Sequence, residues 1–162
     1  MSERFAVFGM VTFLHDLFTA VWIGGLIMMG ITLIPAVRKT LGRGPQVKEL
    51  MDAIQRRQSI LVYISIAGLI LTGFLQARRS PAFVGLFSFA NTYSMALAVK
   101  HILVAAMVAI SLYRSLAVGR RGQPLTPSQE KLSAGLLFLN IGMGITVLLL
   151  SGLLAALPVL PG

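Results

Sequence analysis

Two histidines with charged neighbours are the residues of this chain best suited to chemistry. His15 and Asp16 stand in the apolar stretch TFLHDLFTAVWIGG, and Lys100 and His101 stand in the apolar stretch MALAVKHILVAAM. The 162 residues contain no further histidine and no cysteine. Imidazole nitrogens bind metal ions and haem iron. Thiolate metal sites, iron–sulfur clusters, disulfides and covalent c-type haem attachment all require cysteine and are excluded.

The composition is that of a membrane protein. Hydrophobic residues make up 56% of the chain and charged residues only 12%, with a mean hydropathy of +0.85. A soluble domain has about a quarter of its residues charged. The net charge of +9 does not indicate nucleic-acid binding, because the basic residues cluster in short connections between apolar runs.

Four segments are long and apolar enough to cross a bilayer, which takes about 20 residues. They are residues 8–37, 59–77, 92–116 and 132–157. Ten basic residues lie in or beside the two connections on one side of the membrane (Arg38, Lys39, Arg43, Lys48, Arg56, Arg57, Arg114, Arg120, Arg121 and Lys131). Only three lie on the other side (Arg4, Arg78 and Arg79). The positive-inside rule then puts both termini outside. We expect an all-α integral membrane protein, a single four-transmembrane-helix bundle over residues 1–162, in the inner (plasma) membrane as a multi-pass protein.

The connections contain local signals of helix ends. In TPSQEKL, Thr126 is a predicted N-cap, Pro127 suits the first helical position and Gln129 completes a capping box. Pro45 is predicted near the start of a cytoplasmic extension of the second helix. The outer link SPAFVGLFSFANTY, with four aromatic residues, is predicted to lie at the headgroup level. The first apolar run is too long for a signal peptide and is expected to remain as a helix.

The two histidines are predicted to lie at one depth. The first and third helices run in the same direction, with His15 seven residues and His101 nine residues past the start of their spans. At 1.5 Å per residue the mismatch is about 3 Å. If the imidazoles face each other, Asp16 and Lys100 turn to the same flank, where opposite charges compensate the cost of burial in lipid.

Haem b fits this arrangement best. Two neutral imidazoles supply its axial nitrogens, and the porphyrin fills the space between the helices. The predicted metal ligands are therefore His15 and His101, and Lys100 is placed to pair with a propionate. Asp16 and Trp22 complete the predicted cofactor-binding set, although Trp22, on the same face as His15, is equally explained by helix packing. Hydrogen bonding between helices is the expected role of Asn140, Thr146 and Ser151.

Copper is the alternative ligand, since imidazole and thioether both suit it. Six of the eight methionines are spread along the first, third and fourth spans, two above the histidines and four below, as along a path inward (Met10 and Met95; Met28, Met29, Met107 and Met143). Methionine is also ordinary filling in an apolar bundle. No M-x-x-x-M or H-x-x-M pair surrounds either histidine.

Two stretches resemble known families. LHDLFTAVWIGGLIMMGITLIPAVRK is similar to the first helix of the CopD-like (copper resistance D) membrane family, and YSMALAVKHILVAAMVAISLYRSLA is similar to a later helix of it. Both also resemble four-helix, haem-binding protoporphyrinogen oxidases of the HemJ type. The first resemblance implies copper transport across the membrane. The second implies haem bound through His15 with a functional Lys100. His101, directly after that lysine, departs from both patterns.

The expected function is electron transfer by a membrane cytochrome b. Bis-histidine ligation leaves no open iron position, which favours electron transfer over substrate chemistry. A chain of this size with almost no soluble part is expected to be a small subunit of a membrane redox complex rather than a stand-alone enzyme. A quinol or another membrane partner would donate the electrons. Copper transport and protoporphyrinogen oxidation remain the alternative functions.

Overall fold

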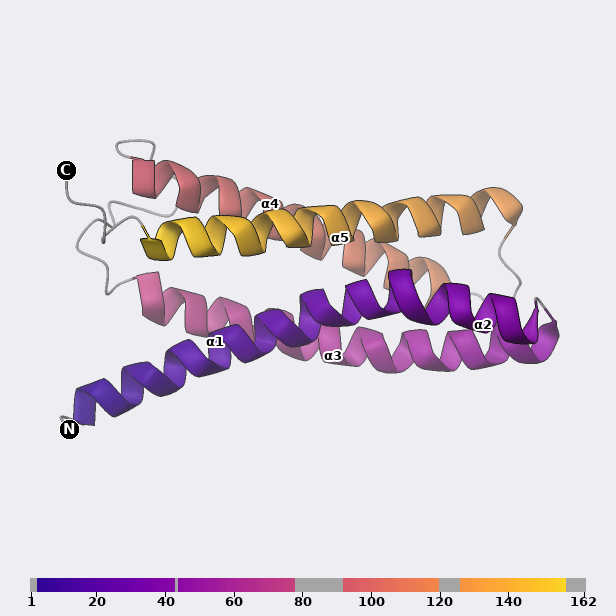
Figure 1. The fold of residues 1–162 in the computed structure, drawn as a ribbon, viewed down its shortest axis with the longest axis horizontal. Helices are drawn as coiled ribbons and strands as arrows, with labels where there is room; N and C mark the ends of the chain where they lie inside the picture. Colours follow the sequence, from indigo (N-terminus) through magenta and orange to yellow (C-terminus); the bar gives the residue numbers. More distant parts are fainter. Residues whose placement is uncertain (1–2, 43, 78–91, 120–125, 157–162) are drawn as a thin grey trace.

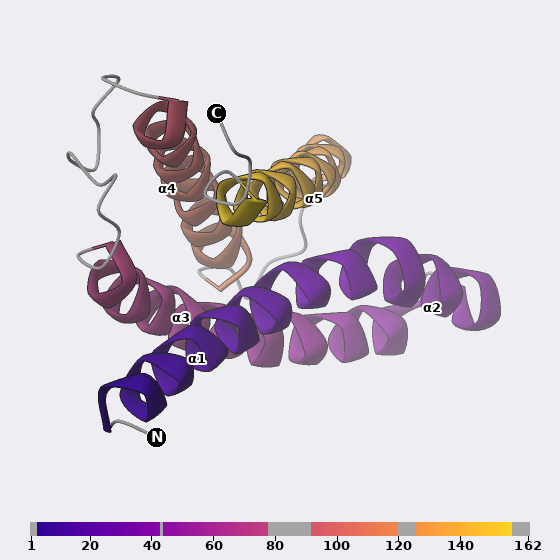
Figure 2. The same ribbon diagram turned by 60° about the vertical axis from the view of Figure 1, so that its left-hand side comes forward.

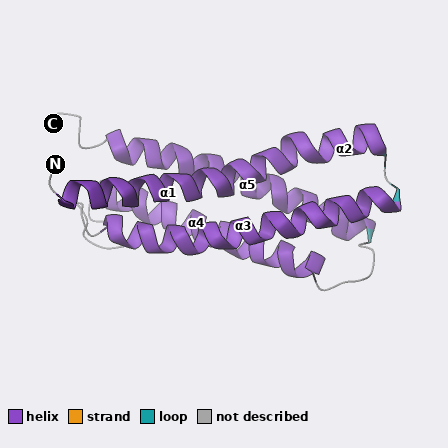
Figure 3. Ribbon diagram, turned by 90° about the horizontal axis from the view of Figure 1, so that it is seen from below, coloured by secondary structure: helices purple, strands orange, loops and turns teal. Residues whose placement is uncertain are grey.

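The computed structural model describes residues 3–42, 44–77, 92–119 and 126–156, and every element in these ranges is a helix (Figures 1 and 3). The helices are α1 (Glu3–Ile27), η1 (Met28–Leu33), α2 (Ile34–Leu41), α3 (Pro45–Ala77), α4 (Thr92–Gly119) and α5 (Pro127–Ala156). Four stretches are long and apolar enough to cross a membrane: Phe5–Leu41, Pro45–Gln76, Thr92–Leu116 and Pro127–Ala156. The all-α four-helix membrane bundle is confirmed, and the protein is a multi-pass membrane protein.

The four long helices alternate in direction and form two closely packed pairs. The first stretch, α1 to α2, packs along α3, and α4 packs along α5, while α1 against α5 and α3 against α4 make smaller contacts (Figure 2). This order of neighbours places α1 and α4 diagonally across the bundle. The start of α1 and the end of α5 lie at one end, here called the terminal end (Figure 1).

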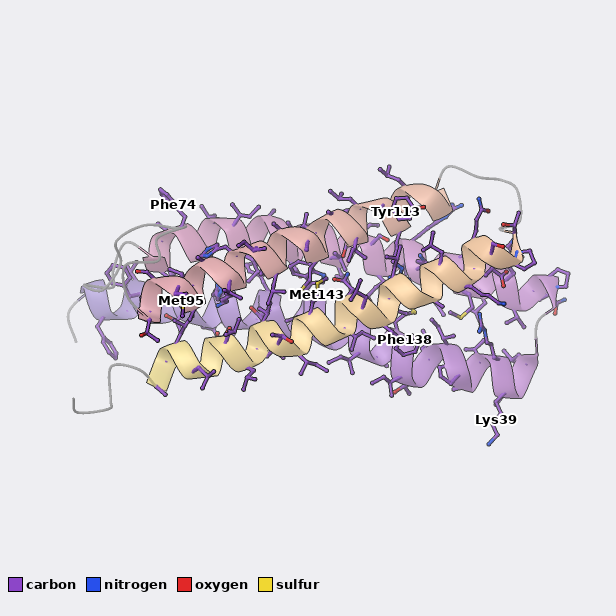
Figure 4. The ribbon with its side chains drawn as sticks, turned by 90° about the horizontal axis from the view of Figure 1, so that it is seen from above. Lys39, Phe74, Met95, Tyr113, Phe138 and Met143 are labelled. Atoms are coloured by element: carbon purple, nitrogen blue, oxygen red, sulfur yellow. The ribbon has the colours of Figure 1, made fainter. Side chains whose placement is uncertain are left out.

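The opposite end, here called the basic end, holds the end of α2 and the start of α3 (Figure 1). Of the basic side chains described near this end, all but Arg114 are exposed, and Lys39 points away from the bundle (Figure 4). The described exposed set is Arg38, Lys39, Lys48, Arg56, Arg57 and Lys131. This distribution agrees with the charge pattern from which we predict that the basic end faces the cytoplasm.

The first spanning stretch is one continuous helix that contains a π-helical turn. The π-helical η1 joins α1 to α2, and Pro35 occupies the second position of α2. A proline has no amide hydrogen for the helical ladder, and its ring clashes with the carbonyl four residues earlier. The π turn just before Pro35 accommodates this, so the helix continues without breaking. It then ends at Gly42, whose φ of 75° suits glycine.

Both predicted helix starts are confirmed. The helix α3 begins at Pro45 and α5 at Pro127. At the latter, the backbone N–H of Thr126 donates to Gln129 Oε1 over 3.1 Å, and the backbone N–H of Gln129 donates to Thr126 Oγ1 over 3.4 Å. These reciprocal bonds are the predicted capping box. The predicted outer link lies almost wholly outside the described residues; its last residues, Thr92 and Tyr93, begin α4.

The core is a narrow column of apolar side chains along the bundle axis. Nine residues form it: Trp22, Ile23, Leu26, Met29, Val62, Met107, Leu137, Ile141 and Val147. Glycines allow close helix contact there: a Cβ added at Gly144 would lie 3.1 Å from Ile23 Cγ2, and one added at Gly68 would collide with the ring of Phe18. Many large apolar side chains face outward instead, as lipid contact requires (Figure 4).

Of the three polar residues predicted to bond between helices, one does so. Asn140 Nδ2 donates to Ser111 Oγ over 2.9 Å and to the Met107 carbonyl over 3.4 Å, which joins α5 to α4. The prediction was wrong for Thr146 and Ser151, whose hydroxyls donate to carbonyls one turn earlier in α5. A hydroxyl near its own i−4 carbonyl needs no neighbouring helix to be satisfied.

Candidate functional site

Both histidines lie inside the terminal half of the bundle and are half-buried. His15 belongs to α1 and His101 to α4, the two helices that face each other diagonally. The charges of Lys100, Asp16 and His101 all act on the imidazole of His15. The structure thus places all four predicted site residues in the terminal half of two helices, α1 and α4, that are not direct neighbours.

The tautomer of His15 follows from its hydrogen bonds. His15 Nδ1 lies 2.9 Å from Thr72 Oγ1 on α3. That hydroxyl donates its hydrogen to the Gly68 carbonyl over 2.7 Å, so it can only accept from the imidazole. The hydrogen of His15 is therefore on Nδ1, and Nε2 holds the lone pair that binds a metal.

His101 has the same tautomer, which a different hydrogen bond fixes. Its Nδ1 lies 2.7 Å from the carbonyl oxygen of Leu97, one turn earlier in α4. A carbonyl oxygen only accepts, so Nδ1 must donate, and the ring again has its lone pair on Nε2. A metal-bound histidine typically donates its second ring N–H to a carbonyl, carboxylate or water, which fixes the ring and strengthens the ligand. Both imidazoles satisfy this requirement.

Small residues surround the two rings. A Cβ added at Gly73 of α3 would lie 3.5 Å from Cε1 of His15, so this glycine leaves room for the imidazole. On α4, Ala98 is fully buried beside Lys100 and His101. Thr19, four residues after His15, donates its hydroxyl hydrogen to the His15 carbonyl over 2.8 Å, which is a bond within α1. His15 and His101, with these small neighbours, are the residues here that could hold a metal or cofactor.

The two charged neighbours differ in burial. Lys100 is partly buried, whereas Asp16, on α1, is exposed. The negative charge of Asp16 nevertheless acts on the Lys100 ammonium. Opposite charges at one level reduce the cost of keeping either in a membrane. Lys100 thus provides a partly buried cation next to His101 in the chain, and Asp16 an exposed anion next to His15.

Trp22 lies in the core rather than beside the histidines. Only 2% of its side chain is exposed, and it packs in the central column with Met107 and Leu137. Seven residues after His15, it is about 10 Å deeper in the bundle. Its indole Nε1 is buried without a hydrogen-bond partner. The structure accounts for Trp22 by packing, the second of the two roles considered for it.

The methionines do not form a continuous line inside the bundle. Met107 and Met29 are core residues, but Met10, Met28 and Met95 have about half or more of their side chains exposed at 58%, 62% and 48% (Met95 is labelled in Figure 4). A path for a soft cation would need thioethers that face each other. The arrangement suits apolar filling and lipid contact.

Sequence reasoning missed Thr72, the acceptor for His15. Its type gave no signal, because a threonine in an apolar helix most often bonds its own i−4 carbonyl, as Thr72 also does. The signal available was register: α1 and α3 run antiparallel and pack closely, so counting turns along the hairpin places Thr72 opposite His15.

Across the described ranges, no group of three or more histidine, cysteine or acidic side chains could hold a metal ion. The candidate site instead offers two imidazoles. No protein-family model, curated protein or solved structure matches the chain.

Proposed function

We propose that the chain is an integral membrane b-type haem protein that transfers electrons, with His15 and His101 as the two axial ligands. One observation supports this above the others: both intramembrane imidazoles make Nδ1–H bonds, which put the ring lone pair on Nε2, the nitrogen that would bind iron. A porphyrin supplies four nitrogens, so a haem iron needs only two ligands from the protein.

The remaining residues of the site have defined tasks in this proposal. Thr72 and the Leu97 carbonyl orient the rings, and Gly73 gives the His15 ring its space. The Lys100 ammonium is the cationic group at the same level and is suited to a propionate. Haem iron ligated by two imidazoles supplies one-electron transfer without an open position for substrate. The protein would then serve as a small subunit of a membrane redox complex, with a quinol or a membrane partner as donor.

An absorption spectrum of the purified protein tests the proposal. We expect a Soret band and a sharp reduced α-band in the dithionite-treated protein, both lost in His15→Ala and in His101→Ala. Bound copper without a Soret band would instead support the copper-transport alternative. Haem that persists in His101→Ala, with protoporphyrinogen turnover that depends on Lys100, would support the oxidase alternative.

Thr72→Val provides a finer test, because valine keeps the shape and removes the acceptor. Loss of such an outer hydrogen bond typically lowers metal affinity about 10–100-fold. We expect weakened haem retention and a higher midpoint potential, since an imidazole without this bond donates less to ferric iron. Thr146→Val is the matched control: its hydroxyl is on the exposed face of α5 and bonds only its own helix. Equal haem affinity in both variants would contradict the role of Thr72.

A further inference from the structure

A cavity lined by both polar and apolar side chains lies between the helices near the basic end, far from the histidines. It has a volume of about 30 Å³ and is lined by residues of α1, η1, α3, α4 and α5. Arg114 is 13 residues past His101, and Gln58 is 14 residues before Thr72, which puts both about 20 Å below the histidine level. Two labelled residues locate this region in Figure 4. Tyr113 directly precedes Arg114 of the lining, and Phe138 directly follows Leu137 of the lining.

Two groups of the cavity lining are buried hydrogen-bond donors without acceptors. Arg114 Nε and Gln58 Nε2 are both inaccessible to solvent and have no partner. A buried donor left unpaired costs about 1–3 kcal/mol, and more when it is charged. Arg114 never loses its proton in a protein, so its buried Nε–H needs an acceptor in this place. The unpaired donors therefore indicate a missing acceptor.

The other lining residues add a further hydrogen-bond donor to the cavity but no acidic acceptor. Ser111 accepts the Asn140 amide through its hydroxyl oxygen, so its own hydrogen is left for a second partner. None of the lining residues is acidic (Leu26, Met29, Gln55, Gln58, Ser59, Val62, Tyr63, Ser111, Arg114, Ser115 and Leu137). The cavity thus presents a fixed positive charge and further donors to whatever enters it.

The place of the amide group of Gln58 depends on a glycine. A Cβ added at Gly25 of α1 would collide with Gln58 Nε2 and lie 3.0 Å from its Cδ. The absence of a side chain at Gly25 therefore lets the amide of Gln58 pass between α1 and α3 at the cavity. An alanine would displace the end of this flexible side chain without moving backbone.

We propose that this cavity binds the phosphate group of an anionic lipid from the leaflet at the basic end. Guanidinium pairs with phosphate oxygens through two parallel bonds, and basic pockets between membrane helices at the cytoplasmic side suit anionic headgroups. About 30 Å³ accommodates roughly two water-sized groups, so phosphate oxygens enter while the acyl chains stay in the bilayer. The proposal is independent of haem binding.

Lipid binding by the full-length protein in neutral detergent tests this proposal. Dioleoylphosphatidylglycerol is titrated against dioleoylphosphatidylcholine, with bound lipid counted by native mass spectrometry and stability followed by the shift in Tm. We expect one phosphatidylglycerol retained by the wild type and an affinity about tenfold lower in Arg114→Gln. Arg57→Gln is the matched control, because Arg57 is exposed at the same end and does not line the cavity.

Two more variants keep the test valid if Arg114→Gln fails to fold, which circular dichroism would show. Gln58→Leu and Gly25→Ala retain every charge but remove or displace the second donor, and we expect both to bind phosphatidylglycerol several-fold more weakly. Equal affinity in Arg114→Gln and Arg57→Gln would overturn the proposal, since binding would then reflect general attraction to a basic surface. Inorganic phosphate that raises Tm as well as the lipid at equal concentration would overturn the lipid as its source.

Discussion

At the scale of single residues, the opposite charges of Lys100 and Asp16 predict shifts of opposite sign in the midpoint potential when each is removed. Lys100 and Asp16 both act on His15. A positive charge near iron favours the reduced state, and a negative charge favours the oxidised state. We therefore expect Lys100→Met to lower the midpoint potential of the proposed haem and Asp16→Asn to raise it. The shift for Lys100 should be on the order of 60 mV, a tenfold change for one electron.

The two shifts should also differ in size. Asp16 is exposed, whereas Lys100 is partly buried, so the effect of Asp16→Asn should be the smaller one. Potentiometric titration of each purified variant measures both. Lys131→Met serves as the control, because Lys131 is an exposed cation on α5 near the basic end. Shifts of the same sign for Lys100→Met and Asp16→Asn would contradict the placement of these charges around the iron.

Sequence spacing predicts that His15 and His101 lie at one level of the bundle, but not what orients their rings. In the structure, His15 lies in α1 and His101 in α4, both in the terminal half of the bundle. The partner of each ring depends on rotation about the helix axis and on the neighbouring helix. The bond to Thr72 requires the packing of α1 on α3, which the apolar pattern of a membrane helix does not specify.

At the scale of helices, the contact between α1 and α3 depends on Gly68. A Cβ there would collide with the ring of Phe18, which lies one turn from His15. Overpacking of this kind typically costs about 1–3 kcal/mol. We expect Gly68→Ala to lower the free energy of unfolding by that amount, measured by denaturation of the solubilised protein in sodium dodecyl sulfate.

Two comparisons show whether the effect comes from this contact. Gly142→Ala should leave stability unchanged or raise it, because nothing lies within 4 Å of the added Cβ and alanine is the better helix former. Adding Phe18→Leu to Gly68→Ala should restore much of the loss. A Gly68→Ala protein as stable as the Gly142→Ala protein would mean that the helices do not approach this closely.

Helix ends were predicted more reliably than the faces of helices. The capping residues around Pro127 and the proline at the start of α3 act locally, so their sequence is sufficient. The third span was predicted with the ends that the structure gives, Thr92–Leu116. By contrast, the π turn before Pro35 and the bonds of Thr146 and Ser151 within α5 depend on geometry that hydropathy does not encode.

At the scale of the whole molecule, the distribution of charge predicts the orientation in the membrane. The terminal end and the basic end are separated by the length of the bundle (Figure 1). Since basic connections are retained in the cytoplasm, the site of His15 and His101 should lie near the outer surface. An outer position would bring the haem close to an acceptor outside the membrane, and the proposed lipid site would then lie in the inner leaflet.

Cysteine labelling measures this orientation directly, because the natural chain has no cysteine to react in the background. Phe5→Cys places a thiol at the terminal end, and Lys39→Cys places one at the basic end; both side chains are exposed. A membrane-impermeant maleimide applied to intact cells should label Phe5→Cys and leave Lys39→Cys unlabelled until the membrane is opened. The reverse pattern would put both termini and the histidine site on the cytoplasmic side. The electron acceptor would then have to be a cytoplasmic one, and the lipid would have to come from the outer leaflet.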